Sequence, residues 1–305
     1  MPAASRRFTA HDLELLLVSV IWGGNFSVSK YALEGIPPLP FSALRFLSSS
    51  VLLLLVARRA GVAVPLPRRT LWSLIGLGVV GNTLYQTAFM TGLAITSATN
   101  SAMIIASLPV VVALLGTILG VERASTALWT GVVLGTTGVG LVVAAHGVHF
   151  DARNLRGDLL VLFAVFCWSL YMLGVRRAGA GVNPLWITAV TAAAGTPGLV
   201  LIGLPGMLRL PWSQVTPKHW AAFAYAALLS LVLCYVLYNR AVQALGSGRT
   251  ALYNCVTPLV AMLIAWLTLG EVPTAVQFVG VALVIGGVLV SVTAASPVGA
   301  GGVPE

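Results

Sequence analysis

Each half of the chain ends with the same pattern, which reads LGVERASTALWTGVVLGTTGVGLVV over residues 119–143 and LGEVPTAVQFVGVALVIGGVLV over residues 269–290. In both stretches a turn with a glycine and a glutamate precedes an apolar segment with glycines at intervals. A shift of 149 positions places Glu271 on Glu122. The same shift pairs Pro258 with Pro109, Gly280 with Gly131 and Gly287 with Gly138. The chain therefore contains an internal duplication.

The duplication extends upstream, where the best shift is 146 positions and places Trp168 on Trp22. It also pairs Arg176 with Lys30, Pro184 with Pro38 and Leu185 with Leu39. The difference of three residues between the two shifts falls between the blocks, where a loop can absorb it. Duplication in a strongly apolar chain is typical of transporters that are built from two related helix bundles, with the substrate site between them.

The composition predicts a membrane protein. Of the 305 residues, 58% are hydrophobic and only 8% are charged, which is more apolar surface than a soluble fold of this size can bury. Apolar stretches of about 20 residues recur, each long enough to cross a hydrocarbon core of roughly 30 Å. We expect an all-α integral membrane protein with ten transmembrane helices, at about residues 13–32, 40–57, 71–92, 97–119, 125–145, 157–178, 184–204, 219–243, 248–269 and 274–294.

These spans divide into two repeats of five, residues 13–145 and 157–294, followed by a short C-terminal tail at 295–305. Because five is an odd number, the second repeat must enter the membrane in the opposite direction to the first. Lys30 and Arg176 illustrate this, since they occupy equivalent positions and are expected on opposite faces. The sequence thus predicts inverted repeats around a central cavity, related by a pseudo-two-fold axis in the membrane plane.

The formal net charge of +9 is explained by orientation and not by nucleic-acid binding, because the cations are not gathered on a soluble face. With the N-terminus inside, eleven cations are cytoplasmic and five fall on the other side, as the positive-inside rule requires. The eleven are Arg6, Arg7, Arg58, Arg59, Arg68, Arg69, Arg123, Arg176, Arg177, Arg240 and Arg249, and the five are Lys30, Arg153, Arg156, Arg209 and Lys218. We expect a multi-pass protein of a bacterial inner membrane with both termini cytoplasmic.

Beside the two closing segments, the chain carries IWGGNFSVSKYAL at residues 21–33 and SALRF at residues 42–46. Together these motifs resemble the EamA domain and the ten-helix branch of the drug/metabolite transporter superfamily, and the overall pattern is most similar to the YddG-type amino-acid exporters. The resemblance implies a basket in which the first four helices of each repeat line a central cavity and the fifth lies at the periphery. It also implies export of small amino acids or metabolites. The first repeat departs from the closing motif, because Val121 separates Gly120 from Glu122.

Polar and aromatic side chains form one stripe on each of four predicted helices. They are Trp22, Asn25 and Phe26 on the first, Tyr85, Gln86 and Phe89 on the third, Trp168 and Tyr171 on the sixth, and Tyr235 and Tyr238 on the eighth. Facing lipid, amides and phenols would lack hydrogen-bond partners, so we expect these stripes to face inward and to bind substrate. Aromatic walls suit flat or apolar side chains and can hold an ammonium group. Alternatively the stripes pack the helices together, or the rings lie at the membrane interface.

Pro109 and Pro258 occupy equivalent positions near the middle of the fourth and ninth predicted spans. Each removes a helical hydrogen bond and clashes with the preceding turn, so we expect paired hinges that move during transport, with a static kink as the alternative. Asn100 and Asn254 lie near these breaks and could bind substrate. Arg45 is the one permanent charge within a predicted span, and it could attract a carboxylate at the outer mouth or bind backbone carbonyls.

No Asp, Glu or His lies near the middle of a predicted span. We therefore expect substrate to move down its own gradient, or to be coupled through some other group, and we leave proton coupling open. The three cysteines have no metal-binding spacing, and nothing in the sequence indicates a metal or cofactor. An enzyme is not expected, because the four histidines lie at span ends or in loops, away from any deep nucleophile.

The combined prediction is an exporter of amino acids, including aromatic and other apolar ones, that works by alternating access between inverted repeats. The alternatives are a transporter of another small metabolite, a drug or a phosphorylated sugar, or a channel. A phosphorylated substrate would need several inward cations, and only Arg45 and Lys30 come near. The oligomeric state is open, and a monomer would suffice.

Overall fold

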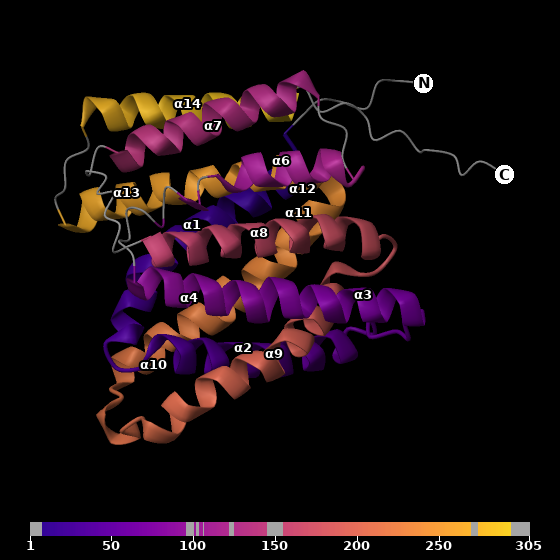
Figure 1. Ribbon diagram of the computed structural model, residues 1–305, viewed down its shortest axis with the longest axis vertical. Coiled ribbons are helices and arrows are strands. Elements are labelled where there is room, and N and C mark those ends of the chain that lie inside the picture. Colours follow the sequence, from indigo (N-terminus) through magenta and orange to yellow (C-terminus); the bar gives the residue numbers. More distant parts are fainter. Residues whose placement is uncertain are drawn as a thin grey trace.

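A computed structural model of the protein describes residues 8–95, 101, 104–105, 107–121, 125–144, 155–269 and 274–293. Within these ranges every regular element is helical (Figure 1). Some residues that were singled out in the sequence lie outside the described part: Asn100, Glu122, Glu271, the tail at 295–305, and the side chains of Phe26 and Lys30.

The first half of the chain forms α1 (Ala10–Leu33), α2 (Pro38–Arg59), α3 (Arg68–Gly78), η1 (Val79–Leu84), α4 (Tyr85–Ile95), α6 (Leu108–Ile118) and α7 (Thr126–Ala144). The second half forms α8 (Leu155–Ala178), α9 (Pro184–Arg209), η3 (Trp212–Gln214), α10 (Pro217–Ala224), η4 (Tyr225–Leu233), α11 (Cys234–Leu245), α12 (Ser247–Leu252), η5 (Tyr253–Cys255), α13 (Val256–Leu269) and α14 (Ala275–Thr293). The matched prolines Pro38 and Pro184 start α2 and α9, where a missing backbone N–H costs nothing.

Four described helical stretches are long and apolar enough to cross a membrane: Pro38–Arg59, Leu155–Ala178, Pro184–Arg209 and Pro217–Leu245. α6 and parts of α7 and α14 are apolar but shorter. Large apolar side chains also stand on the outer surface, among them Trp72, Ile118, Leu201, Leu208 and Leu267. A nearly all-helical fold with apolar spans is therefore confirmed, whereas the number of ten spans remains a prediction.

A π-helical segment interrupts the long third helix of each half. η1 lies between α3 and α4, and η4 lies between α10 and α11, without a gap in either case. The shift of 149 positions carries residues 79–84 onto 228–233, which fall inside η4. π-turns are rare and often mark functional sites, because the extra residue in the turn redirects the helix face that follows it. A tyrosine follows each segment closely, Tyr85 after η1 and Tyr235 after η4.

The closing helices of the two halves, α7 and α14, lie side by side at one end of the molecule (Figure 1). A Cβ built on Gly138 would lie 2.5 Å from the carbonyl oxygen of Gly280, and one built on Gly287 would lie 2.7 Å from the carbonyl oxygen of Gly131. Only glycine permits so close an approach of two helix backbones. Residues with higher numbers on α7 contact residues with lower numbers on α14, so the two helices run antiparallel.

The matched helices α2 and α9 form a second close pair. A Cβ on Gly203 would lie 2.7 Å from the Ala43 Cβ, and the hydroxyl oxygens of Thr196 and Ser50 lie 3.2 Å apart. This pair is antiparallel as well. The first turn of α1 and the last turn of α14 lie toward the same side of the molecule, at the right of the view (Figure 1).

Both matched prolines lie where a helix is interrupted. Pro109 is in the first turn of α6, just after a turn in which the Ser107 N–H donates to the Ile104 carbonyl at 3.0 Å. Pro258 is the third residue of α13, and the 3₁₀ segment η5 precedes that helix. A proline in the first turn of a helix has no intrahelical N–H bond to lose. Pro109 therefore lies in the first turn of α6, and Pro258 lies in the first turn of α13, after the 3₁₀ segment that separates α13 from α12.

Candidate functional site: an aromatic cluster between the two halves

The predicted stripes meet in a group of rings centred on Trp168 of α8. Its ring centroid lies 5.0 Å from Tyr85, 5.0 Å from Tyr171, 5.4 Å from Tyr235 and 5.8 Å from Tyr238. We define the aromatic cluster as Trp22, Phe46, Tyr85, Phe89, Trp168, Tyr171, Tyr235 and Tyr238. Its members come from α1, α2, α4, α8 and α11, so both halves of the chain contribute.

Trp22 joins the first helix to this cluster. Its ring centroid lies 5.1 Å from Tyr238, 6.2 Å from Tyr235 and 6.5 Å from Trp168. Its Nε1–H donates to the carbonyl of Ser230, within the π-helical η4, at 2.9 Å. Trp22 and Trp168 are the two tryptophans that the shift of 146 positions pairs. Equivalent residues of the two halves therefore contact each other at the centre of the fold.

Two tyrosines of the cluster are held by hydrogen bonds within the protein. Asn239 Nδ2 donates to the Tyr171 hydroxyl and to Thr188 Oγ1, each at 2.9 Å. Asn254 Nδ2, in η5, donates to the Tyr238 hydroxyl at 2.7 Å. Tyr171 is fully buried. These contacts fix the rings of Tyr171 and Tyr238. For Tyr171 they agree with the alternative that the polar and aromatic stripes pack the helices together.

The phenols of Tyr85 and Tyr235 differ from these two. Neither hydroxyl has a hydrogen-bond partner among the described residues, although both rings are deep in the cluster. Phe89 stacks on Tyr85 with centroids 5.9 Å apart and an interplanar angle of 8°. Tyr85 and Tyr235 therefore keep donor groups that no other described group uses.

Arg45 lies beside the cluster and is 7% exposed. Its guanidinium carbon sits 5.4 Å from the centroid of Phe41 and 5.8 Å from that of Phe46, over the two ring faces. It is close enough to the phenols of Tyr85 and Tyr235 to interact with them electrostatically. Its Nε is buried and has no acceptor, and no ion pair to Arg45 occurs in the part of the chain that the structure describes.

The remaining amides of the predicted site lie next to the cluster. Asn25 is one turn beyond Trp22 on α1, and its buried Oδ1 has no hydrogen-bond partner among the described groups. Gln86 is buried, and its Nε2 donates to Ser42 Oγ of α2 at 3.4 Å. Asn254 is tied to Tyr238. The predicted substrate-binding residues that the structure describes therefore lie in or next to the aromatic cluster. The Phe26 side chain and Asn100 are outside the described part of the chain.

Sequence reasoning missed two groups of residues at this site. Phe46 was not singled out, although its centroid lies 6.3 Å from that of Tyr235. Thr188 and Thr191 of α9 were also missed, although the Thr191 hydroxyl lies 3.3 Å from that of Tyr171. The polar i, i+3 spacing of these two threonines within an apolar helix was a usable signal.

A second polar group lies at the start of α1. Asp12 is fully buried, and both of its carboxylate oxygens accept from Arg249 Nη2 at 2.7 Å. The Tyr253 hydroxyl and the Thr9 backbone N–H each donate to it at 2.7 Å. Burial raises the pKa of Asp12, but the hydrogen bonds from Thr9, Tyr253 and Arg249 outweigh it and hold the pKa below the usual value. Arg240 pairs with Glu14 nearby at 3.2 Å, so α1 is tied to α11 and α12.

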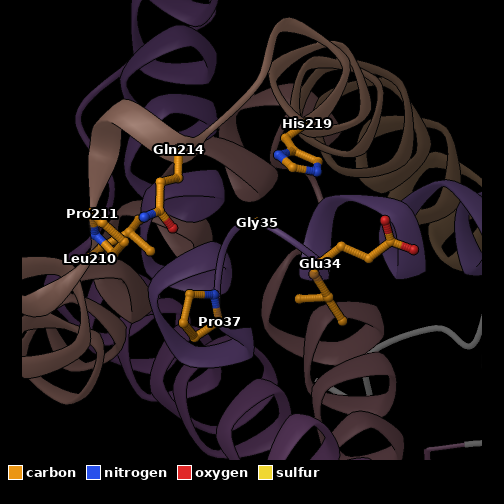
Figure 2. Close-up of a pocket in the computed structure, with 8 residues that line it drawn as sticks. Glu34, Gly35, Pro37, Leu210, Pro211, Gln214 and His219 are labelled. Carbon is orange, nitrogen blue, oxygen red and sulfur yellow. The ribbon is translucent and has the colours of Figure 1, made fainter.

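A pocket of about 270 Å³ lies at one end of the bundle, between the α1–α2 loop and the α9–α10 connection. Figure 2 shows Glu34 and His219 on one side of it and Gln214 and Pro211 on the other. None of the predicted substrate-binding residues lines this pocket. Among the described residues no group of His, Cys, Asp and Glu could hold a metal ion, and the three cysteines are free and buried.

The profile of the EamA-like transporter family matches the chain twice, over residues 11–144 and 155–293. The uncharacterized transporter YyaM of Bacillus subtilis (strain 168) is 29% identical over 279 residues, covering 90% of this chain and 91% of YyaM. A probable terminal-alkyne amino-acid exporter of Streptantibioticus cattleyicolor is 28% identical over 275 residues, covering 90% of this chain and 91% of the exporter. An S-adenosylmethionine/S-adenosylhomocysteine transporter of Chlamydia trachomatis serovar L2 is 27% identical over 274 residues, covering 85% of this chain and 83% of that transporter.

A crystal structure of another protein superposes on this structure with a TM-score of 0.78 at 19% identity, covering 94% of this chain and 97% of the other, and so has the same fold. The resemblance to the EamA domain and to the drug/metabolite transporter superfamily is confirmed by the family match, and the family and its relatives are transporters and not enzymes. With its two profile matches spanning most of the sequence, this chain belongs to the EamA-like transporter family.

Proposed function

We propose that the protein exports amino acids with aromatic or other apolar side chains across a bacterial inner membrane, and that the aromatic cluster is its substrate site. The observation that carries this proposal is the contact of Trp22 with Trp168, since equivalent residues of two repeats meet only at the axis that relates them. Transporters built from inverted repeats bind substrate at that interface. Aromatic walls there bind an apolar side chain by stacking.

The inverted arrangement is supported by reciprocal contacts. A two-fold rotation that exchanges Gly131 with Gly280 and Gly138 with Gly287 converts one close contact of α7 and α14 into the other. Ser50 and Thr196, also 146 positions apart, contact each other as Trp22 and Trp168 do. Because the matched helices are antiparallel, the axis is perpendicular to them and lies in the membrane plane. Ten spans in two repeats, 13–145 and 157–294, fit this symmetry.

The geometry of the cluster and of the interrupted helices supports transport by alternating access. The rings of the aromatic cluster contact one another, so an apolar side chain can enter only if the two halves rock apart and replace ring–ring contacts with ring–substrate contacts. The interrupted helices at Pro109 and Pro258, and the π-helical η1 and η4, are matched places where the backbone can bend. A fixed channel would leave these paired interruptions without a role.

The substrate class is supported by chemistry that two relatives share. An amino-acid exporter and a transporter of S-adenosylmethionine both handle molecules that carry an α-amino-acid group. A phosphorylated sugar is less suited to this site, because Arg45 is the one cation beside the cluster among the described residues. Another small metabolite with an α-amino-acid group remains the alternative substrate.

The distribution of charge supports an orientation with both termini in the cytoplasm. The start of α1 and the end of α14 lie toward one side, and the excess of arginines in the loops of that side supports its assignment as the cytoplasmic side. The Asp12–Arg249 pair then ties α1 to α12 at the cytoplasmic end. One protomer contains the complete cluster, so a monomer suffices.

Counterflow in proteoliposomes tests this function. Vesicles preloaded with unlabelled phenylalanine should take up external labelled phenylalanine transiently and saturably, as a carrier does and a channel does not. Empty vesicles and vesicles preloaded with glucose 6-phosphate serve as controls. Acceleration by glucose 6-phosphate and not by phenylalanine would overturn the proposed substrate class.

A pH gradient tests the coupling. Because no Asp, Glu or His was found near mid-membrane, phenylalanine uptake should reach the same final level with and without a proton gradient. Concentrative uptake driven by protons would contradict this prediction, and Asp12 would then be the first residue to replace.

A further inference from the structure

We propose that Arg45 binds the carboxylate of the transported amino acid, with the phenols of Tyr85 and Tyr235 as additional donors. This inference rests on the proposed function and names the group that recognises the polar end of the substrate. It places the carboxylate at the α2 side of the aromatic cluster and the apolar side chain against Trp168.

The first argument is the unusual environment of this cation. Arg45 is 7% exposed, and its Nε is buried and lacks an acceptor. The other deeply placed arginine, Arg249, has the carboxylate of Asp12 at 2.7 Å. Buried charges in proteins are normally paired, so a buried guanidinium without an anion indicates a site for one that comes from outside the chain.

The second argument is the set of neighbouring groups. The guanidinium carbon lies over the rings of Phe41 and Phe46, and these apolar rings cannot accept hydrogen bonds from its N–H groups as a carboxylate would. Tyr85 and Tyr235 add two hydroxyls that have no partner among the described residues. One cation and two neutral donors suit a single negative charge, whereas a phosphate would need more cations.

The third argument is position. Phe46, the next residue in α2, has its centroid 6.3 Å from that of Tyr235, and Tyr235 lies 5.4 Å from Trp168. A carboxylate bound at Arg45 therefore leaves the rest of the molecule beside the cluster. Asn25, one turn from Trp22, supplies a buried Oδ1 without a partner, which can accept from the substrate ammonium.

Equilibrium competition on the purified, reconstituted protein tests the proposal. The probes are L-phenylalanine, 3-phenylpropionate, which lacks the amino group, and phenethylamine, which lacks the carboxylate. The unaltered protein should bind phenylalanine and 3-phenylpropionate and discriminate strongly against phenethylamine. Arg45→Gln should weaken phenylalanine binding roughly 10- to 100-fold and abolish the discrimination against phenethylamine, since one charge-assisted contact is lost.

The matched control is Arg209→Gln, which removes an exposed arginine from the last turn of α9 and should change neither affinity nor discrimination. If Arg45→Gln does not fold, Arg45→Lys carries the test. It retains the charge but not the forked geometry, so affinity should fall while the preference for carboxylates persists.

The outcomes separate this inference from the proposed function. If the unaltered protein transports phenylalanine and Arg45→Gln still prefers it over phenethylamine by the original factor, the carboxylate assignment is overturned and the exporter proposal stands. If the unaltered protein neither binds nor transports any of the three probes, the exporter proposal itself is overturned.

Discussion

At the scale of single residues, Trp168 holds the central position in the aromatic cluster. Tyr171 and Tyr238 are tied to Asn239 and Asn254. Trp168 hydrogen-bonds to the Tyr238 side chain and contacts five other rings. Trp168 is therefore the residue whose removal should affect substrate binding most directly.

Trp168→Ala should reduce phenylalanine counterflow to the level of empty vesicles, because the stacking surface and the contact across the two halves disappear together. Trp168→Phe should retain part of the flux. Trp72→Ala is the matched control, since Trp72 is 69% exposed on α3 and should leave flux unchanged. Normal flux by Trp168→Ala at a normal protein level would remove the cluster from the substrate path.

Asp12 gives a prediction about stability. Asp12→Asn leaves Arg249 without its anion, and breaking such a buried pair costs about 3–5 kcal/mol, equivalent to roughly 5–10 °C in the midpoint of thermal unfolding. Glu14→Gln, at a partly exposed pair, should cost no more than about 1 kcal/mol. Circular dichroism or fluorescence melts in detergent measure both variants.

The pH dependence has a definite sign. The folded pKa of Asp12 is held below that of an unfolded aspartate, about 3.9, so its contribution is fully present above that value and is lost as pH falls through the folded pKa. The difference in melting midpoint between the unaltered protein and Asp12→Asn should thus be constant from pH 5 to pH 8. A difference that shrinks steadily over this range would show that Asp12 titrates there.

At the scale of elements, α7 and α14 pack through glycines that leave no space for a side chain. The adjacent residues Gly286 and Gly287 make this testable, because a Cβ on Gly286 would meet nothing within 4 Å, whereas one on Gly287 would lie 2.7 Å from a backbone oxygen. The two positions share the same helix and the same intrinsic propensity, so a difference between them reports on packing alone.

Gly287→Ala should lower the melting midpoint, because the two helices must move apart to admit the methyl group. Gly286→Ala should leave the midpoint unchanged or raise it slightly, since alanine is the better helix former by up to about 1 kcal/mol. Differential scanning fluorimetry of the two variants provides the comparison. Equal midpoints would mean that α7 and α14 are not packed as described.

At the scale of the whole molecule, the proposal depends on the direction in which each half enters the membrane. The α2–α3 connection and the α9–α10 connection lie beyond the ends of the matched helices α2 and α9, which run antiparallel. Inverted repeats therefore put these two connections on opposite faces of the membrane.

Single-cysteine labelling of whole cells tests this topology, in a background with Cys167, Cys234 and Cys255 replaced by alanine. A membrane-impermeant maleimide should label Ser213→Cys in intact cells, and Val64→Cys only after permeabilisation. Both native residues are exposed in the structure. Labelling of both sites from the same face would contradict the inverted repeat and, with it, the site between the halves.

The sequence by itself determined what depends on local pattern and on the solvent. The composition predicts helical spans, because lipid cannot satisfy free backbone groups. The duplication is visible as matches at fixed shifts along the sequence. The stripes with Trp22, Tyr85 and Trp168 follow from helical periodicity. The tertiary structure alone decided which groups meet. The pairing of Asp12 with Arg249 joins residues 237 positions apart, and the unpartnered state of Arg45 depends on every helix packed around it. Neither could be read from the sequence, because a side chain's partner is set by helix packing and not by its neighbours along the chain.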